Sequence, residues 1–147
     1  MRTDRKRFWS GLLVIAISYS LGLLFIYAAA SKLLDFEKFK VQIGQSAMLT
    51  DYAGVLAWLV PAAEIVIAVM LVFEGLRLPG LFASFGLMMM FTAYIIVILI
   101  FAERVPCACG GILEKMSWLE HLVFNIVFVV LAGVGVNLET RLKEKGG

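Results

Sequence analysis

The segment FWSGLLVIAISYSLGLLFIYAAA, residues Phe8 to Ala30, runs for 23 residues without a charged side chain. As an α-helix it would be about 34 Å long at a rise of roughly 1.5 Å per residue, enough to cross the hydrocarbon core of a bilayer. The whole chain shares this character. Of its 147 residues, 62% are hydrophobic and 16% are charged, and its mean hydropathy is +0.96. A soluble domain has roughly 25% charged residues. The sequence therefore predicts an integral membrane protein.

Three more stretches are long and apolar enough to span the membrane, at residues 52–73, 78–102 and 118–138. All four predicted spans should be α-helices, because the bilayer core offers unpaired backbone groups no partner and four segments cannot close a barrel. We predict an all-α bundle of four transmembrane helices. A single membrane domain should fill residues 1–147 and leave no room for a separate soluble catalytic module.

The first predicted span has some features of a secretion signal. Met1 to Arg7 is basic, and Ala28-Ala29-Ala30-Ser31 resembles a signal-peptidase site. Its apolar run, however, exceeds the roughly 7 to 15 residues of a typical signal sequence. We expect the span, residues 8–30, to be retained. The alternative, a cleaved signal, would leave the sidedness of the later spans unchanged.

The connection between the first two spans has its own helical pattern. Leu33, Phe36, Phe39 and Ile43 recur at helical spacing, with charged residues on the other faces. This predicts a short amphipathic helix on the outer surface of the membrane. A continuation of the first span beyond the lipid headgroups would show the same periodicity, so both interpretations are open.

Small residues and prolines mark where the spans bend or approach each other. Ser18 with Gly22, and Gly80 with Ser84, stand four residues apart, which allows close helix packing. Pro61 lies inside the second span, where a missing backbone donor favours a kink.

The distribution of lysine and arginine predicts the orientation. With the N-terminus inside, eight of the 13 basic residues fall on the cytoplasmic side and five outside, and a dense cluster from Arg2 to Arg7 precedes the first span. We expect a bacterial inner-membrane protein with both termini cytoplasmic and the loop 103–117 in the periplasm. The net charge of only +2, with basic residues gathered at the two ends, indicates a lipid environment and no nucleic-acid partner.

The predicted periplasmic loop contains both cysteines of the chain, Cys107 and Cys109, beside Gly110 and Gly111. Two residues of extended chain span roughly 6.6 Å, near the upper limit for the Cα atoms of a disulfide, so a bend brings the pair into range. So small a ring would be strained, and strained disulfides are easily reduced. We predict a redox-active pair. The alternative is two small hydrophobic side chains without chemistry.

The fourth span should begin at Ser117, because Ser117 and Glu120 match the capping-box pattern. Trp118, an interfacial aromatic residue, then shares one helix face with His121 and Asn125. His121 would raise the thiolate fraction of a nearby cysteine, or would simply reach water. Asn125 would form a hydrogen bond between helices.

A metal site is the rival interpretation of the cysteine pair. Cys107, Cys109 and His121 could ligate Cu(I), with Met116 adding a thioether. Zinc suits these residues less well, because structural zinc sites usually have four ligands.

Glu64 is a carboxylate inside the second span, about 18 Å along the helix from Tyr52 at roughly 1.5 Å per residue. Such a residue should be protonated, paired or beside water, and a function is the default expectation. Asn125, Tyr94 and Thr92 are its candidate partners in the sequence. A protonated carboxyl that only links two helices is the alternative.

Four motifs together resemble a known family: SKLLDFEKF after the first span, PAAEI in the second, CACGG before the last, and SWLEHLVFN at its start. With these, the chain is similar to the MauE branch of the DoxX-like membrane proteins over nearly its whole length. The cysteine-glycine loop followed by the Trp and Asn helix start is the specific part. The resemblance implies a four-helix membrane protein that takes part in redox reactions outside the cytoplasm. The founding member is required for maturation of methylamine dehydrogenase, alongside a thioredoxin-like partner.

The resemblance implies that Cys107 and Cys109 exchange electrons with a thioredoxin-fold protein or a client thiol. The chain has no second cysteine pair, so electron flow across the membrane would need another redox centre. A quinone bound between the helices would supply it, although the sequence contains no quinone motif. Two other functions are open: a non-catalytic subunit that anchors or assembles a larger complex, and a Cu(I)-binding membrane protein.

Overall fold

A computed structural model describes residues 1–45, 49–101 and 117–147 of the chain. These residues form helices and contain no strand. The elements are α1 (Arg2–Leu34), α2 (Phe36–Gly44), η1 (Thr50–Tyr52), α3 (Ala53–Val72), η2 (Glu74–Leu76), α4 (Arg77–Phe101) and α5 (Trp118–Gly146). By length and composition, the helices α1, α3, α4 and α5 can cross a membrane. The predicted all-α fold with four spans is confirmed.

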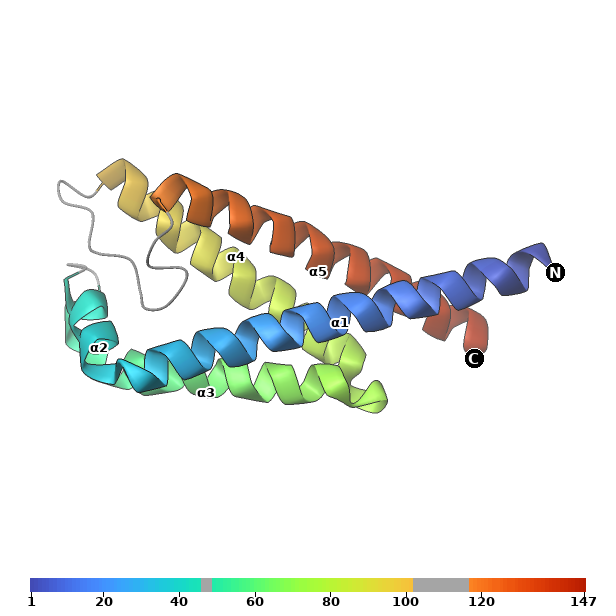
Figure 1. Ribbon diagram of the computed structural model, residues 1–147, viewed down its shortest axis with the longest axis horizontal. Helices are drawn as coiled ribbons and strands as arrows, with labels where there is room; N and C mark the ends of the chain where they lie inside the picture. The colour runs from blue at the N-terminus through green and yellow to red at the C-terminus, as the bar shows by residue number, and fades with distance from the viewer. Residues whose placement is uncertain (46–48, 102–116) are drawn as a thin grey trace.

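The four long helices alternate in direction and form a bundle (Figure 1). Around it, α1 packs against α3 and α5, and α4 packs against the same two helices, so α1 and α4 lie across the diagonal. Both chain termini lie at one end of the bundle (Figure 1). The opposite end holds α2, the end of α4 at Phe101 and the start of α5 at Trp118 (Figure 1).

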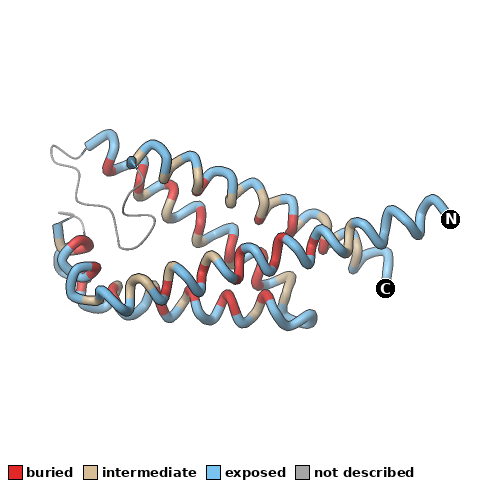
Figure 2. The backbone as a smooth tube through the Cα atoms, in the orientation of Figure 1, coloured by how far each residue is buried: buried red, intermediate tan, exposed pale blue. Residues whose placement is uncertain are grey.

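Buried residues gather where the helices face one another, and the outward faces are mostly exposed, as Figure 2 shows. On α1, for example, Val14, Ile17, Leu21 and Phe25 belong to the central apolar core. The outward faces carry many large hydrophobic side chains; Leu23, for instance, is 70% exposed. Such a surface would be a liability in water, but lipid chains cover it in a bilayer.

α2 is a separate helix and not a continuation of α1. The chain breaks at Asp35, whose backbone is non-helical with φ −110° and ψ 45°. The apolar face of α2 packs on the start of α3, where Phe39 and Ile43 lie in one cluster with two alanines of that helix. The predicted short helix is therefore confirmed from Phe36 onward, whereas Leu33 belongs to α1, and the helix covers the start of α3 at this end of the bundle.

The small-residue pattern marks a close approach between α3 and α4. A Cβ atom at Gly80 would lie 3.1 Å from the Cβ of Met70 and 3.3 Å from the backbone nitrogen of Leu71. At Gly22 the nearest atom, a carbonyl oxygen, would be at an ordinary 3.9 Å. α3 continues as one helix through the buried Pro61.

Gly80→Leu should destabilise the bundle by about 1–3 kcal/mol, because the new side chain meets the backbone of α3 and forces the two helices apart. The matched control is Gly86→Leu, since nothing lies within 4 Å of a Cβ at that position of the same helix. Thermal unfolding of both variants in detergent measures the difference. Equal midpoints would show that α3 and α4 are not in close contact at Gly80.

Candidate functional site

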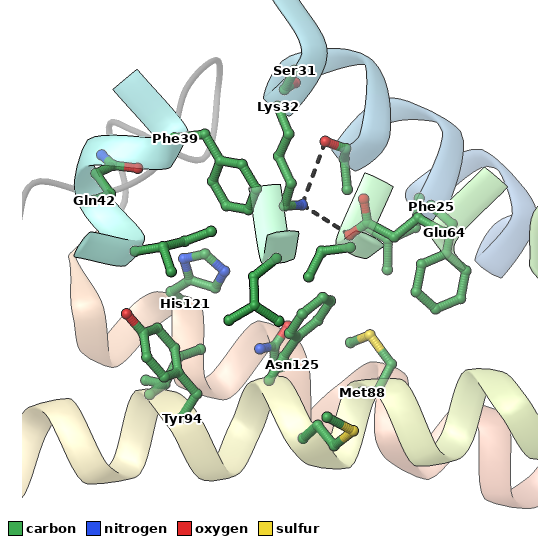
Figure 3. A pocket seen from close by; sticks show the side chains of 18 of the residues that line it. Phe25, Ser31, Lys32, Phe39, Gln42, Glu64, Met88, Tyr94, His121 and Asn125 are labelled. Atoms are coloured by element: carbon green, nitrogen blue, oxygen red, sulfur yellow. Dashed lines mark hydrogen bonds and ion pairs between the residues drawn. The ribbon is translucent and has the colours of Figure 1, made fainter. Parts of the chain in front are cut away.

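A cavity of about 320 Å³ lies among the helices at the end of the bundle that carries α2. Residues of α1, α2, α3, α4 and α5 all contribute to its wall. Most of the wall is apolar, and the rings of Phe25, Phe39, Phe91 and Phe124 take part in it. Polar side chains also line this space (Figure 3); they include Ser31, Lys32, Gln42, Glu64, Tyr94, His121 and Asn125.

The centre of the cavity wall is an ion pair between α1 and α3. Lys32 Nζ donates a hydrogen bond to Glu64 Oε1 at 2.8 Å and a longer one to the carbonyl oxygen of Ala28 at 3.4 Å (Figure 3). The side chain of Glu64 is fully buried, and that of Lys32 is 15% exposed. The pair therefore joins two neighbouring helices in a setting from which water is largely excluded.

The partner of Glu64 is Lys32, which was not among the three candidates considered from the sequence. The hydroxyl of Thr92 donates to the carbonyl oxygen of Met88 on its own helix, and Tyr94 and Asn125 line the same cavity without a hydrogen bond to Glu64 in the structure. The residue that was missed is Lys32. The first span was predicted to end with its charge-free run at Ala30, whereas α1 continues to Leu34, so Lys32 lies inside the helix. A lysine directly after an apolar run, with a carboxylate buried in the next span, was the available signal.

Two aromatic rings flank the lysine. Lys32 Nζ lies 5.7 Å from the ring centroid of Phe39 on α2 and 5.6 Å from that of Phe91 on α4. Both distances are within the range of cation–π attraction. The second carboxylate oxygen of Glu64, Oε2, is buried and has no hydrogen-bond partner among the described residues. An acceptor of this kind is rare in a folded protein and calls for a physical explanation.

α5 begins with the predicted capping box. The backbone N–H of Glu120 donates to Ser117 Oγ at 3.3 Å, and the backbone N–H of Ser117 donates to Glu120 Oε2 at 2.8 Å. This start sets the rotation of α5, so that Trp118, His121 and Asn125 all line the cavity. The rings of Trp118 and His121 stack with centroids 6.4 Å apart and an interplanar angle of 17°. The catalytic and tuning roles predicted for these residues stay predictions.

Cys107, Cys109 and Met116 lie outside the described residues, so the structure does not test the predicted cysteine pair or the Cu(I) site. Within residues 1–45, 49–101 and 117–147, no group of three or more His, Cys, Asp or Glu side chains could hold a metal ion. The segment with both cysteines joins Phe101 to Ser117. Those two flanking residues lie at the end of the bundle that contains the cavity (Figure 1).

Comparison with known proteins gives one family and one relative. A family model described as "Methylamine utilisation protein MauE" matches residues 10–138. A protein of Paracoccus denitrificans described as "Methylamine utilization protein MauE" is 34% identical over 121 residues. The match covers 80% of this chain and 64% of that relative, so the chain spans a little under two thirds of the relative's length. No solved structure matches the chain.

Proposed function

This chain belongs to the MauE family of multi-pass membrane proteins, and on that premise we propose that it is a membrane thiol–disulfide redox protein. One observation carries the proposal. The only two cysteines of the chain stand one residue apart in the sequence, between the end of α4 and the start of α5. The proposed reaction partner is an extracytoplasmic thioredoxin-fold protein or a client thiol. The name of the Paracoccus relative supports a role in methylamine utilisation.

The proposed reaction transfers two electrons through a mixed disulfide. A thiolate of the reduced pair attacks a partner disulfide and releases one partner thiolate. The second cysteine then attacks the mixed disulfide, so Cys107 and Cys109 end as a disulfide and the partner ends with two reduced thiols. The reverse sequence moves the same two electrons from the partner to the pair.

The described residues next to this segment support the exchange. Cys109 stands eight residues before Ser117 in the sequence, so the intervening chain reaches at most about 27 Å. His121 lies one helical turn after Ser117 and lines the cavity beside Trp118. An imidazole within reach of a thiol raises the fraction of reactive thiolate. Asn125 and the ion pair of Lys32 and Glu64 would stabilise the packing of the helices next to the cysteine segment.

The proposed orientation places both termini in the cytoplasm and the cysteines in the periplasm. The exposed basic cluster from Arg2 to Arg7 supports it. So does the sequence count, which assigns eight of the 13 basic residues to the cytoplasmic side and five to the outer side.

Thiol labelling of intact cells tests both the orientation and the redox state. A membrane-impermeant mass tag should add no label to the wild-type protein at first and two labels after mild reduction. This result is expected because an oxidised, easily reduced pair on the outside becomes accessible as two thiols. No label after reduction would contradict the proposal, because the thiols would then be buried, metal-bound or cytoplasmic.

A control for sidedness uses the turn between α3 and α4. In a Cys107→Ser/Cys109→Ser background, Gly75→Cys places a single thiol in η2, at an exposed position with nothing within 4 Å of a Cβ. This thiol should be labelled only after the cells are opened. Labelling of Gly75→Cys in intact cells would reverse the proposed orientation.

A further inference from the structure

We propose that the cavity is a binding site for the head ring of a membrane quinone or quinol. Small-molecule sites have volumes of about 300–1,000 Å³ and are mostly apolar, with a few polar groups that orient the ligand. This cavity, at about 320 Å³, has an aromatic and aliphatic wall with Lys32, Glu64 and His121 in it. It lies among helices that span the membrane, where a lipid-soluble ligand is available.

The charge of the site selects a neutral ligand. Lys32 and Glu64 form a 2.8 Å ion pair, so their opposite charges balance, and the other two charged residues of the wall, Asp35 and Lys38, are also opposite in sign. An anion entering the cavity would meet the buried carboxylate of Glu64. A cation would meet the ammonium of Lys32, which already lies against the rings of Phe39 and Phe91. Either ion would be desolvated beside a like charge, which is costly in a low-dielectric site.

The hydrogen-bonding groups of the site require a ligand that both donates and accepts. Glu64 Oε2 is a buried acceptor without a donor in the described ranges 1–45, 49–101 and 117–147, and a quinol hydroxyl is a donor. The Lys32 ammonium has three N–H donors. Glu64 Oε1 and the Ala28 carbonyl take two of them, and a quinone carbonyl can take the third. His121 adds a ring nitrogen from α5 to the same wall (Figure 3). A lipid acyl chain would leave the Glu64 oxygen unsatisfied.

The aromatic residues of the wall suit a flat ring. The rings of Phe39 on α2 and Phe91 on α4 lie beside the lysine ammonium. On α5, the ring of Trp118 stacks on that of His121. Offset stacking and edge contacts with such rings stabilise a planar aromatic or quinoid ligand. The polar groups and the aromatic faces thus favour the same class of molecule.

A bound quinone would give the cysteine pair a two-electron partner, and this consequence rests on the proposed function. Oxidation of two thiols to one disulfide releases two electrons and two protons. One quinone takes up these two electrons and two protons and becomes one quinol, so the reaction balances without another oxidant. The binding site itself does not depend on the thiol reaction.

Fluorescence of Trp118 measures the binding. In a Trp9→Phe/Trp58→Phe background, Trp118 is the single tryptophan, because the chain has three and the other two are exposed on α1 and α3. The purified full chain in detergent is titrated with a short-chain ubiquinone and with a short-chain menaquinone, both fully substituted on the ring so that thiols cannot add. We expect saturable quenching by at least one of them.

Two substitutions on α3 provide the matched comparison. Val60→Phe fills part of the cavity that Val60 lines and should weaken binding at least tenfold. Val66→Phe adds the same ring to an outward-facing position, 57% exposed, and should bind like the parent. His121→Leu removes a polar group of the wall and should also weaken quinone binding. This second variant tests the site even if Val60→Phe does not fold.

Equal quenching in all these variants would mean that the quinone only partitions into detergent, and it would overturn the proposal. So would the absence of quenching by both quinones. The Cys107→Ser/Cys109→Ser variant separates the two hypotheses. It should bind quinone normally although it cannot exchange disulfides, so failure of the thiol reaction and failure of the quinone site are observed independently.

Discussion

Lys32→Met should destabilise this protein by about 3–5 kcal/mol, since removing one partner of a buried ion pair leaves the other charge uncompensated. The carboxylate that remains, on Glu64, is fully buried and has no exposed surface through which water could reach it. Its second oxygen already lacks a hydrogen-bond partner among the described residues. The variant would remove the lysine donor from Oε1 as well, and so would leave both carboxylate oxygens of Glu64 without a hydrogen-bond donor among the described residues.

The reverse substitution should cost less. Glu64→Leu leaves Lys32 without its carboxylate, but Lys32 lies in the last turn of α1 and is 15% exposed. A long lysine side chain near a helix end can move its ammonium toward the headgroups and water. The double variant Lys32→Met/Glu64→Leu should recover most of the lost stability, because well-packed apolar residues often replace a buried ion pair without net cost.

Denaturant-induced unfolding in mixed micelles measures this series, with Lys40→Met as the matched control at an exposed position of α2. The expected order of stability is the control and the double variant highest, Glu64→Leu lower and Lys32→Met lowest. If Lys32→Met is as stable as Lys40→Met, the ion pair does not form in the membrane protein.

Cys107→Ser/Cys109→Ser should abolish thiol–disulfide exchange completely, because the chain contains no other cysteine. The purified full chain, oxidised beforehand, is mixed with reduced thioredoxin as the probe, and the disulfide content of both proteins is followed by mass. The wild-type protein should oxidise thioredoxin, whereas the double variant should not. Ala108→Ser is the control, since it changes the residue between the cysteines and keeps both thiols.

Single substitutions should identify the attacking cysteine. In cells, the single variant that keeps the attacking cysteine should accumulate a mixed disulfide with the partner that reductant removes, because its resolving thiol is missing, whereas the variant that lacks the attacking cysteine should accumulate little. The double variant should accumulate none, while its assembly into the membrane stays normal. If the double variant keeps full function in cells, the scaffold hypothesis replaces the redox hypothesis.

The sequence alone determined those features that depend on neighbouring residues in the chain. The charge-free run from Phe8 to Ala30 specified a helix long enough to cross a bilayer, since membrane helices must satisfy their own backbone hydrogen bonds. Ser117 and Glu120 specified the start of α5, since a capping box acts within one turn. Helical periodicity then placed His121 and Asn125 on one face, which is the face that lines the cavity.

Only the tertiary structure decided which side chains meet across helices. Lys32 and Glu64 are 32 residues apart and pair because α1 packs against α3. The sequence could not name the partner, and the candidates that it offered, Thr92, Tyr94 and Asn125, lie on α4 and α5. Helical periodicity determines the face on which a buried charge lies but not the neighbour that the face will meet, because that depends on the packing order of the whole bundle. The cavity arises for the same reason, since five helices contribute to its wall and no single segment contains its pattern.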